Sequence, residues 1–560
     1  MILPRASRRL PGRVFLFLLL SVALPMTAQG QAEHVEIGHP VYDFLNRLHV
    51  RQVVEGFSRT VLPLERKQVT QYLRDAAARS ELLSEGERAV LARYTDEFVA
   101  EADGTQRAVV LLGAGFPGSL AEVFGEDEKF LYRWQSADRS STLYLDLLAS
   151  LEYRTLLAEQ GNANVTLGQI GGRFRGTLGG LVGYTLTATN GTAMGNRSLA
   201  MNDPQLRRNF NYAALDKEFF DLTEAVLSIT WDWGSASFGK EKRLWGTGRS
   251  QWLLLSGNAQ PFDALRIDAA YGDVRFSFLH GSVLSEVEML EGGRPYYDAK
   301  YVAMHRVEAD VFDALRFGVF ESVVYSGREV DLAYLNPVNF YKSAEHAGGD
   351  RDNPMLGFEL STLGLRNLEL YGSWLIDDVD FSRLGDSWWG NKFIYQAGAI
   401  STILPNTDIT AEYTRINPYV YTHRLRGNQY THNGEALGVE LAPNSEEYML
   451  DVTHWCGARL RLGARAQYIR HGRNVRAADG TLLVNNGAEI YESRDYERDS
   501  EIALFLAGPR DETLLATISL RYEPWRNMAL HARYRFRTRE SEIDGKLTDH
   551  FLSAMLELAL

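Results

Sequence analysis

The sequence predicts an all-β transmembrane β-barrel of about 16–18 antiparallel strands with a small N-terminal α-helical module. Three observations predict this fold class. Apolar and polar residues alternate along much of the chain, the N-terminus has the pattern of an export signal, and no later segment is long and apolar enough for a transmembrane helix. A closed barrel is the other structure that satisfies its backbone hydrogen bonds inside a membrane.

The alternation is clearest between residues 143 and 153. Every second residue there is apolar, from Leu143 to Tyr153, and the interleaved positions include Asp146 and Glu152. A period of two is typical of a strand with one apolar face. Rings at strand ends are typical of the aromatic girdles of membrane barrels, although a soluble β-sandwich also alternates. The same pattern, closing on an aromatic ring, recurs over 174–184, 225–233, 460–468, 514–522 and 528–536.

The N-terminal region favours the membrane barrel over the sandwich. Four arginines before residue 14 precede an apolar run over 14–24 and a stretch of small residues near Ala28. This order of basic, apolar and small residues is typical of a secretory signal. We therefore expect a signal peptide over 1–32 and a mature protein in the outer membrane, where closed barrels are found.

Between the signal and about residue 105 the hydrophobic period becomes helical. Val41, Phe44 and Leu48 share one short apolar face, and 65–77 reads as a second helix. Ser84 followed by Glu87 makes a capping box that predicts the start of a third helix. These helices predict a periplasmic module or plug over 33–105.

The remaining residues, 106–560, have the rhythm of strand, turn and strand and are expected to form the barrel. A strand of about 10 residues with its share of turns gives the strand number stated above. The longer polar stretches are the expected extracellular loops. They are 190–208, 348–354, 423–447 and 472–500.

Composition excludes some functions. The chain has 72 acidic and 59 basic residues, a formal net charge of −13, which argues against a general nucleic-acid binder. Its single cysteine, Cys456, cannot form an intrachain disulfide. The barrel must therefore be held by its backbone ladders and its core.

A row of basic residues lies on the polar face of several C-terminal strands. In a barrel these side chains would point into the lumen, where guanidinium groups bind carboxylates or phosphates through bidentate hydrogen bonds. The alternative is that they pair with lumen acids such as Asp146, Glu152 and Glu224 and only stiffen the wall. The candidate ligand-binding residues of this row, next to His531, are Arg461, Arg465, Arg521, Arg533, Arg535 and Arg537.

Aromatic residues in expected loops are the second candidate binding group. Trp388 and Trp389, the pair 296–297, and Tyr419 with Tyr421 lie among Gly, Asn, Asp and Arg. That mixture stacks on sugar rings and hydrogen-bonds their hydroxyl groups. The alternative is anchoring at the membrane interface, where Trp and Tyr are common.

Motifs for catalysis, metals or cofactors are weak. The carboxylates of 376–380 lack the glycine and terminal glutamate of an EF-hand loop, and Cys456 has no sequence partner that suggests a nucleophile or a zinc site. We therefore expect a protein without catalytic residues, cofactor or metal.

Distinctive motifs occur in several parts of the chain. Residues 40–48 and 63–73 form one of them, and 239–262 form a second that contains Trp-Gly-Thr-Gly. Together with single positions further along, they resemble the capsule assembly Wzi family. The motif residues that we take from this resemblance are Trp245, Gly246, Gly248, Asn258, Pro261, Glu321, Asn336, Pro337, Asp377 and Asp378.

The resemblance implies an outer-membrane barrel of about 18 strands that is closed on the periplasmic side by a helical bundle. It also implies that the protein acts as a lectin and holds capsular polysaccharide on the cell surface. One departure is the C-terminus. Membrane barrels commonly end on an aromatic residue, whereas this chain ends on Leu560.

The resulting hypothesis is a non-enzymatic outer-membrane lectin that attaches or organises an exported polysaccharide. Expected partners are capsular or other exported polysaccharide, outer-membrane lipid, and the machineries of barrel assembly and polysaccharide export, with no nucleic acid. The alternative is a porin-like channel for anionic solutes, in which the same arginines form a selectivity surface. A hydrolase is a third possibility for which no motif is present.

Overall fold

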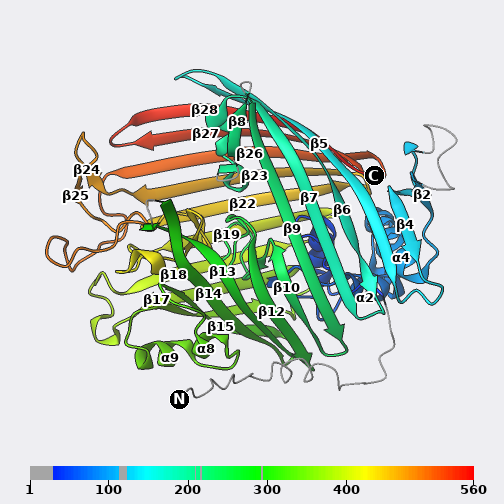
Figure 1. Ribbon diagram of the computed structural model, residues 1–560, viewed down its shortest axis with the longest axis horizontal. Coiled ribbons are helices and arrows are strands. Elements are labelled where there is room, and N and C mark those ends of the chain that lie inside the picture. Colours follow the sequence, from blue (N-terminus) through cyan, green and yellow to red (C-terminus); the bar gives the residue numbers. More distant parts are fainter. Residues whose placement is uncertain (1–29, 113–122, 208–209, 215–216, 292–293) are drawn as a thin grey trace, which may run out of the picture.

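The computed structural model describes residues 30–112, 123–207, 210–214, 217–291 and 294–560. Its main sheet is a closed barrel of 18 antiparallel strands, which confirms the predicted fold class (Figure 1). Among the described residues, no helix is long and apolar enough to cross a membrane. The predicted signal segment, 1–32, lies almost entirely outside the described residues.

The barrel wall follows the order of the chain, so each strand pairs with the next wall strand. The last strand pairs with the first, for example Leu552 with Thr155, and this pairing closes the barrel. The wall strands are β5 (Thr142–Ala158), β6 (Ala163–Leu178), β7 (Val182–Gly195), β9 (Lys217–Trp231), β10 (Gly234–Glu241), β12 (Phe262–Tyr271), β13 (Val274–Glu291), β14 (Arg294–Val311), β15 (Leu315–Ser326), β16 (Asn353–Thr362), β17 (Leu368–Asp378), β18 (Lys392–Ser401), β19 (Thr407–Ile416), β22 (Ser445–Cys456), β23 (Leu460–Gly472), β26 (Arg510–Trp525), β27 (Met528–Ser541) and β28 (Gly545–Ala559).

Short strands accompany the wall. They pair at its ends or within its loops, and they are β1 (Val61–Leu62), β2 (Ala108–Val110), β3 (Glu128–Phe130), β4 (Tyr132–Gln135), β8 (Phe210–Ala214), β11 (Leu244–Trp245), β20 (Thr431–His432), β21 (Glu435–Ala436), β24 (Val475–Arg476) and β25 (Leu482–Val484).

The alternation of the sequence becomes an apolar outer face and a polar inner face. On β26, Leu514, Ile518 and Tyr522 face outward and are exposed, whereas Arg521 lines a cavity inside. Exposed apolar side chains of this kind occur on strands around the barrel, as expected for contact with lipid. One predicted row is wrong in detail, because 174–184 is not one strand. The chain turns at 179–181, between β6 and β7, since Gly179 and Gly180 have positive φ values that suit a tight turn.

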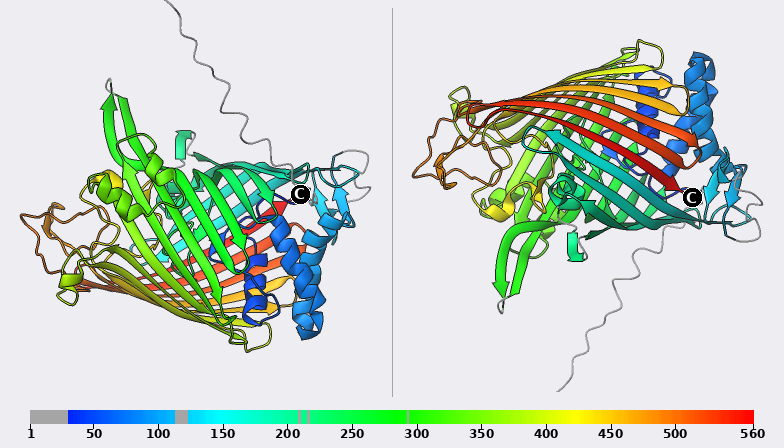
Figure 2. Two further views of the ribbon diagram at one scale, coloured as in Figure 1. Left: turned by 90° about the horizontal axis from the view of Figure 1, so that it is seen from below. Right: turned by 90° about the horizontal axis from the view of Figure 1, so that it is seen from above.

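A helical module closes one end of the barrel (Figures 1 and 2). The predicted capping box is present at α3, where Ser84 and Glu87 exchange side-chain and backbone hydrogen bonds. Arg47 of α1 binds Asp408 of β19, and Arg93 of α3 binds Glu523 of β26. The module consists of α1 (Val41–Val50), α2 (Arg66–Ala78), η1 (Ser80–Leu82), α3 (Glu85–Tyr94), η2 (Thr95–Val99) and α4 (Ala100–Asp103).

The interior of the barrel is filled by two chain segments. The central segment, 242–261, leaves the wall after β10 and passes through the lumen, and the lumen loop, 417–444, folds in after β19. Their side chains, including the fully buried Trp245 and Tyr421, form the largest apolar core together with inward-facing wall residues. The core therefore lies inside the barrel, whereas the outer wall keeps its apolar side chains exposed.

The long connections emerge at the end opposite the helical module (Figure 2). The four predicted loops all belong to connections at this end, although 190–208 begins within β7 and most of 423–447 folds into the lumen. Helices in these connections are α6 (Arg197–Met201), α7 (Pro204–Arg207), α8 (Leu332–Leu335), α9 (Tyr341–Ala347), η3 (Phe381–Arg383) and η4 (Arg426–Asn428). We call this end the loop rim.

Candidate functional site

The six predicted arginines all lie on the inner face of β23, β26 and β27. In the strand register, Arg461 on β23 lies opposite Arg521 on β26. Arg465 lies opposite Thr517, which in turn lies opposite Arg535 on β27. Their outer-face neighbours, such as Tyr534, are exposed apolar side chains. The prediction that this row faces the lumen therefore agrees with the strand register.

Four of the six arginines pair with carboxylates. Arg461 Nη2 lies 2.6 Å from Asp43 of the helical module, so it holds the module to the wall. Arg465 and Arg521 pair with Asp451 at 2.8 Å and Glu523 at 3.0 Å. In a fourth pair, Arg537 Nε donates to Asp549 Oδ2 at 2.6 Å. Three of these pairs stiffen the wall, as the alternative interpretation expected, and the fourth joins the wall to the module, although the partners are not the acids named there.

Arg533 and Arg535 differ from the other four. Within the described part of the chain neither forms an ion pair, and Arg533 is exposed to the lumen. The guanidinium of Arg535 lies 5.1 Å from the ring centroid of Phe551, and its Nε has no hydrogen-bond partner among described residues. These two cations are the part of the row that remains available to an anionic group.

A pocket at the loop rim brings together residues from four connections. It has a volume of about 100 Å³, and its lining includes Asp377, Trp389, Lys392, His423, Arg494 and Tyr496. Trp388 lies next to it, with its ring 5.7 Å from that of Trp389. The predicted residues Asp377, Asp378 and Trp389 therefore meet at one site, and the lumen arginines are not part of it.

Trp389 is the aromatic centre of this rim pocket. Its half-buried ring makes edge contacts with Tyr419, at 6.0 Å, and Tyr496, at 5.6 Å. The guanidinium of Arg494 lies 5.0 Å from the centroids of both Trp389 and Tyr496. The ring is thus fixed by aromatic neighbours and by a cation–π contact.

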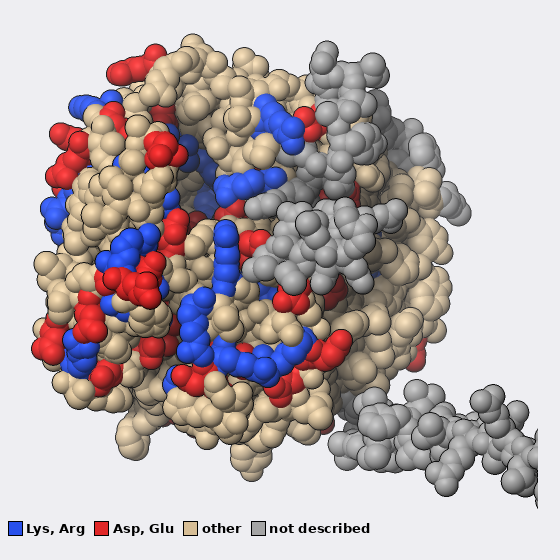
Figure 3. Space-filling model, turned by 60° about the vertical axis from the view of Figure 1, so that its left-hand side comes forward, with Lys and Arg blue, Asp and Glu red and all other residues tan. Residues whose placement is uncertain are grey.

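Polar groups of both signs surround the ring. Asp377 Oδ2 accepts a hydrogen bond from the backbone N–H of Tyr421 at 2.6 Å. Its other oxygen, Oδ1, is buried and has no hydrogen-bond partner within the described residues. Burial and the Lys392 ammonium lower the pKa of His423 to about 4, so this imidazole is neutral at neutral pH. The space-filling view of this end shows acidic and basic side chains intermixed (Figure 3).

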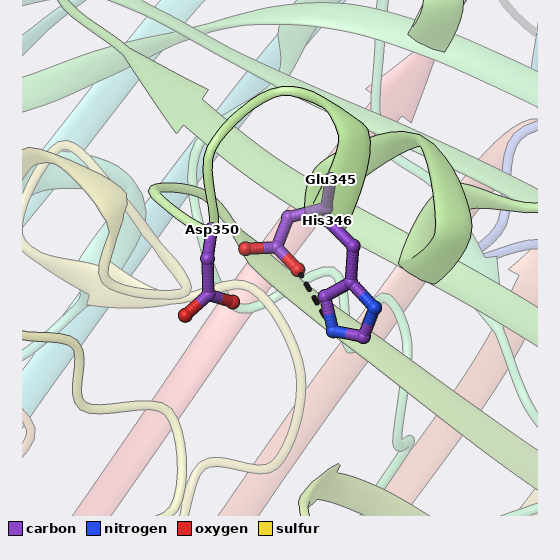
Figure 4. A group of neighbouring side chains, drawn as sticks. All are labelled: Glu345, His346 and Asp350. Atoms are coloured by element: carbon purple, nitrogen blue, oxygen red, sulfur yellow. Dashed lines mark ion pairs between the residues drawn. The ribbon is translucent and has the colours of Figure 1, made fainter.

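At the edge of the rim pocket, Glu345, His346 and Asp350 hold three potential metal-ligand atoms within 4.8 Å of one another (Figure 4). Glu345 Oε2 also lies 3.4 Å from the ammonium of Lys342 and 3.8 Å from His346 Nε2. Burial raises the pKa of Glu345 to about 7. Lys342 already places a positive charge beside Glu345, so nothing in this arrangement requires a metal cation.

The central segment contains five of the motif residues. Wall carboxylates hold its backbone, since Glu412 Oε1 accepts from the N–H groups of Ser250 and Gln251 at 3.0 and 3.1 Å. A Cβ on Gly248 would lie 1.7 Å from the carbonyl oxygen of Gln251, and Gly246 has a φ of 133°, so both positions require glycine. Trp245, Gly246, Gly248, Asn258 and Pro261 thus belong to the segment that crosses the lumen.

Three other motif residues, besides Asp377 and Asp378 of the rim pocket, lie on the outside of the wall. Glu321 is buried on the outer face of β15, and Asn336 and Pro337 form the turn after α8, where Asn336 Oδ1 accepts from the N–H of Val338 at 3.3 Å. They are therefore separate from the rim pocket. Tyr297, expected on a loop, lies instead within β14, and the side chain of residue 296 is outside the described set.

Several rim residues were not predicted from the sequence. Arg494 and Tyr496 lie more than 100 residues from Trp389 in the sequence, and only the fold brings them to it, whereas Lys392 follows Trp389 closely in the chain. The sequence predicts a loop over the polar stretch 472–500, which contains Arg494 and Tyr496, but no motif in it marks these two residues as part of a site.

Comparisons with known proteins agree with this architecture. The family model of capsule assembly protein Wzi matches residues 152–543. Among curated proteins, none matches the chain. Wzi of Escherichia coli, described as an outer membrane protein involved in group 1 capsule assembly and a carbohydrate-binding β-barrel, has a similar structure. It has a TM-score of 0.56 and 13% identity, covering 94% of this chain and 99% of that one.

OprD of Pseudomonas aeruginosa is also among the similar structures, with a TM-score of 0.41, 11% identity, and coverage of 75% of this chain and 95% of that one. The first of these two likenesses supports the fold of the barrel, and the family model extends over most of the wall strands. The resemblance read from the motifs is thereby confirmed, and the chain belongs to the capsule assembly Wzi family.

Proposed function

We propose that this protein is a carbohydrate-binding barrel of the outer membrane that attaches exported polysaccharide to the cell surface through its loop rim. The observation that carries the proposal is the rim pocket, in which one aromatic ring is surrounded by hydrogen-bonding groups of both signs. The E. coli Wzi structure is described as carbohydrate-binding, and membership of that family supports the same class of ligand here.

The chemistry of the pocket suits a sugar. An aromatic face such as that of Trp389 stacks on the C–H face of a pyranose ring and removes apolar area from water. Asp377 Oδ1, buried without a partner in the described chain, would accept a hydrogen bond from a sugar hydroxyl. Arg494 and Lys392 would bind carboxylate substituents of an acidic glycan.

The outer wall supports placement of the barrel in the membrane. The exposed apolar side chains of β5, β6, β9, β26 and β27 face away from a core that is already filled. Contact with membrane lipid would remove these side chains from water. In this proposal residues 1–32 are the signal peptide, 33–105 the periplasmic module and 106–560 the barrel. The loop rim then faces the outside of the cell.

A channel is the weaker proposal. Arg533 and Arg535 would provide an anion-selective surface, but the central segment and the lumen loop pack across the barrel with fully buried side chains. The helical module covers the other end and is tied to the wall by ion pairs. Because the central segment and the lumen loop fill the barrel and the helical module covers its end, Arg533 and Arg535 lie in a closed interior and do not line an open channel.

The test compares polysaccharide retained on cells with polysaccharide released into the medium. Deletion of the gene should leave synthesis unchanged and move polymer into the medium. Complementation with the parent gene should restore retention, and Trp389→Ala should restore it only partly. Truncating an aromatic anchor costs about 2 kcal/mol, or about a 30-fold loss of affinity.

The matched control is Trp233→Ala, which removes an exposed tryptophan at the end opposite the loop rim. It should restore full retention. Binding of the same purified polymer to purified variants separates affinity from export. Unchanged retention in the deletion strain would refute the attachment function for that polymer.

A further inference from the structure

The outer face of β14 and β15 carries polar, ionisable side chains where a lipid-facing wall is expected to be apolar. His305 and Glu321 are opposite each other in the register, with His305 Nε2 3.1 Å from a carboxylate oxygen of Glu321. Met304, the next residue on β14, packs in the lumen core. Because successive side chains alternate between faces, His305 and Glu321 lie on the outside of the barrel.

The pair interrupts an apolar band. On the same outer face, nearer the helical module, Val307, Phe317 and Leu360 are exposed. A carboxylate facing acyl chains is destabilising, so Glu321 needs a cover that satisfies its oxygens.

The outer-wall segment, residues 327–352 with α8 and α9, provides this cover. The backbone N–H of Tyr341 donates to Glu321 Oε2 at 3.0 Å, and the Tyr341 ring lies 4.5 Å from that of His305. The Tyr334 ring lies 5.1 Å from that of Tyr325, and Ala303, Val323 and Tyr325 become fully buried beneath the segment. The chain therefore folds back over the outside of the wall instead of across the lumen (Figure 2).

The segment in turn exposes apolar side chains of its own. Leu332, the first residue of α8, is 76% exposed, and Val338 and Phe340, in the short stretch that joins α8 to α9, are 81% and 54% exposed. Charged residues of the segment, Lys342 and Asp350, line the rim pocket. The segment is thus apolar on one side and charged where it meets the loop rim.

We propose that the outer-wall segment lies in the outer leaflet of the membrane, with Leu332, Val338 and Phe340 in contact with lipid acyl chains. We choose acyl chains as the contacting group because the segment packs on the outer wall at the edge of the exposed apolar band. Its exposed side chains extend that apolar surface. Its amphipathic character is that of an interfacial element. This inference rests on the proposed membrane location and adds a lipid contact made by helical turns.

The experiment uses the full chain in proteoliposomes. Cys456 is replaced by Ser, and single cysteines are introduced as Leu332→Cys and Val338→Cys for nitroxide labelling. Leu360→Cys on the barrel wall is the lipid-facing control, and Leu483→Cys, 56% exposed on β25 of a rim loop, is the water-facing control. All four positions are exposed, so the substitutions should not disturb folding, which heat-dependent electrophoretic mobility checks.

Collisions with oxygen and with a water-soluble nickel chelate are then compared. We expect oxygen-to-nickel ratios at positions 332 and 338 that equal the ratio at 360 and exceed that at 483 several-fold. Ratios equal to that at 483, with 360 still lipid-like, would overturn the inference and leave the membrane location intact. Low collision with both reagents would indicate a protein cover and also overturn it. A water-like result at 360 would refute the membrane location itself.

Discussion

Glu101 is one of the residues that attach the helical module to the barrel wall. Its carboxylate is almost completely buried and binds two guanidinium groups, that of Arg66 in the module, at 2.7 Å, and that of Arg175 on β6, at 2.8 Å. One carboxylate thus joins module and wall, and Glu101→Gln would leave two buried cations short of a counter-charge.

The size of the effect follows from these contacts. Breaking a buried ion pair by neutralising one partner costs about 3–5 kcal/mol. Glu33 remains 3.1 Å from Arg175, so we expect the lower end, about 3 kcal/mol, which raises the detached population about a hundredfold. Brief trypsin treatment of the purified protein over a series of urea concentrations measures that population through cleavage within 33–105.

Glu81→Gln is the control, because Glu81 is an exposed carboxylate of the same module. It should be cleaved like the parent. If Glu101→Gln were also cleaved like the parent, the ion pairs would not hold the module, and the reasoning would be refuted.

The same carboxylate predicts a dependence on pH. Burial alone would raise the pKa of Glu101, but Arg175 and Arg66 lower it to about 2, below its usual 4.5. The stabilisation is therefore fully present above pH 4.5 and is lost as the pH falls towards 2. Acid should detach the module in the parent, and Glu101→Gln should lack this contribution.

Three further predictions concern the lumen and the loop rim. Replacing Arg533 and Arg535 by Gln should leave glycan retention and barrel assembly unchanged, because these cations lie in the closed interior and not in the rim pocket; a loss of retention in assembled variants would instead include them in the binding surface. In a planar lipid bilayer the parent protein should be nearly silent, because the interior is packed, and a steady anion-selective current would instead favour the channel. Burial raises the pKa of Glu345 to about 7, so its contribution to the stability of α9 is present below pH 4.5 and lost as the pH rises through 7. The protection of 341–347 from hydrogen exchange, relative to the intrinsic exchange rate at each pH, should fall over that range in the parent and stay constant in Glu345→Gln.

Much of the fold could be predicted because its signals are local. Alternation along a strand depends on neighbouring residues, and the capping box of Ser84 and Glu87 spans one helical turn. The boundary between β6 and β7 was missed because the turn there is short and the apolar rhythm continues through it. Strand number followed from chain length and was confirmed.

The filling of the lumen could not be predicted. Residues 423–447 are polar enough to read as an extracellular loop, yet Tyr421 and Tyr430 at that connection are buried with hydroxyl groups bonded to Leu253 and Leu254 carbonyls. Their partners lie more than 160 residues away in sequence. The candidate site shows the same limit, since Trp389 was singled out but its neighbour Arg494 was not.

Buried carboxylates of the wall mark the places where the chain folds back onto the barrel. Inside, Glu412 accepts the backbone N–H groups of the central segment. Outside, Glu321 accepts the N–H of Tyr341 at the start of α9. In both cases a buried carboxylate on the wall is satisfied by backbone donors of a loop, and without that loop it would be left uncompensated. A carboxylate at an outward position of a predicted membrane strand therefore predicts a covering segment, and in this chain the nearest long connection, 327–352, is the segment that provides it.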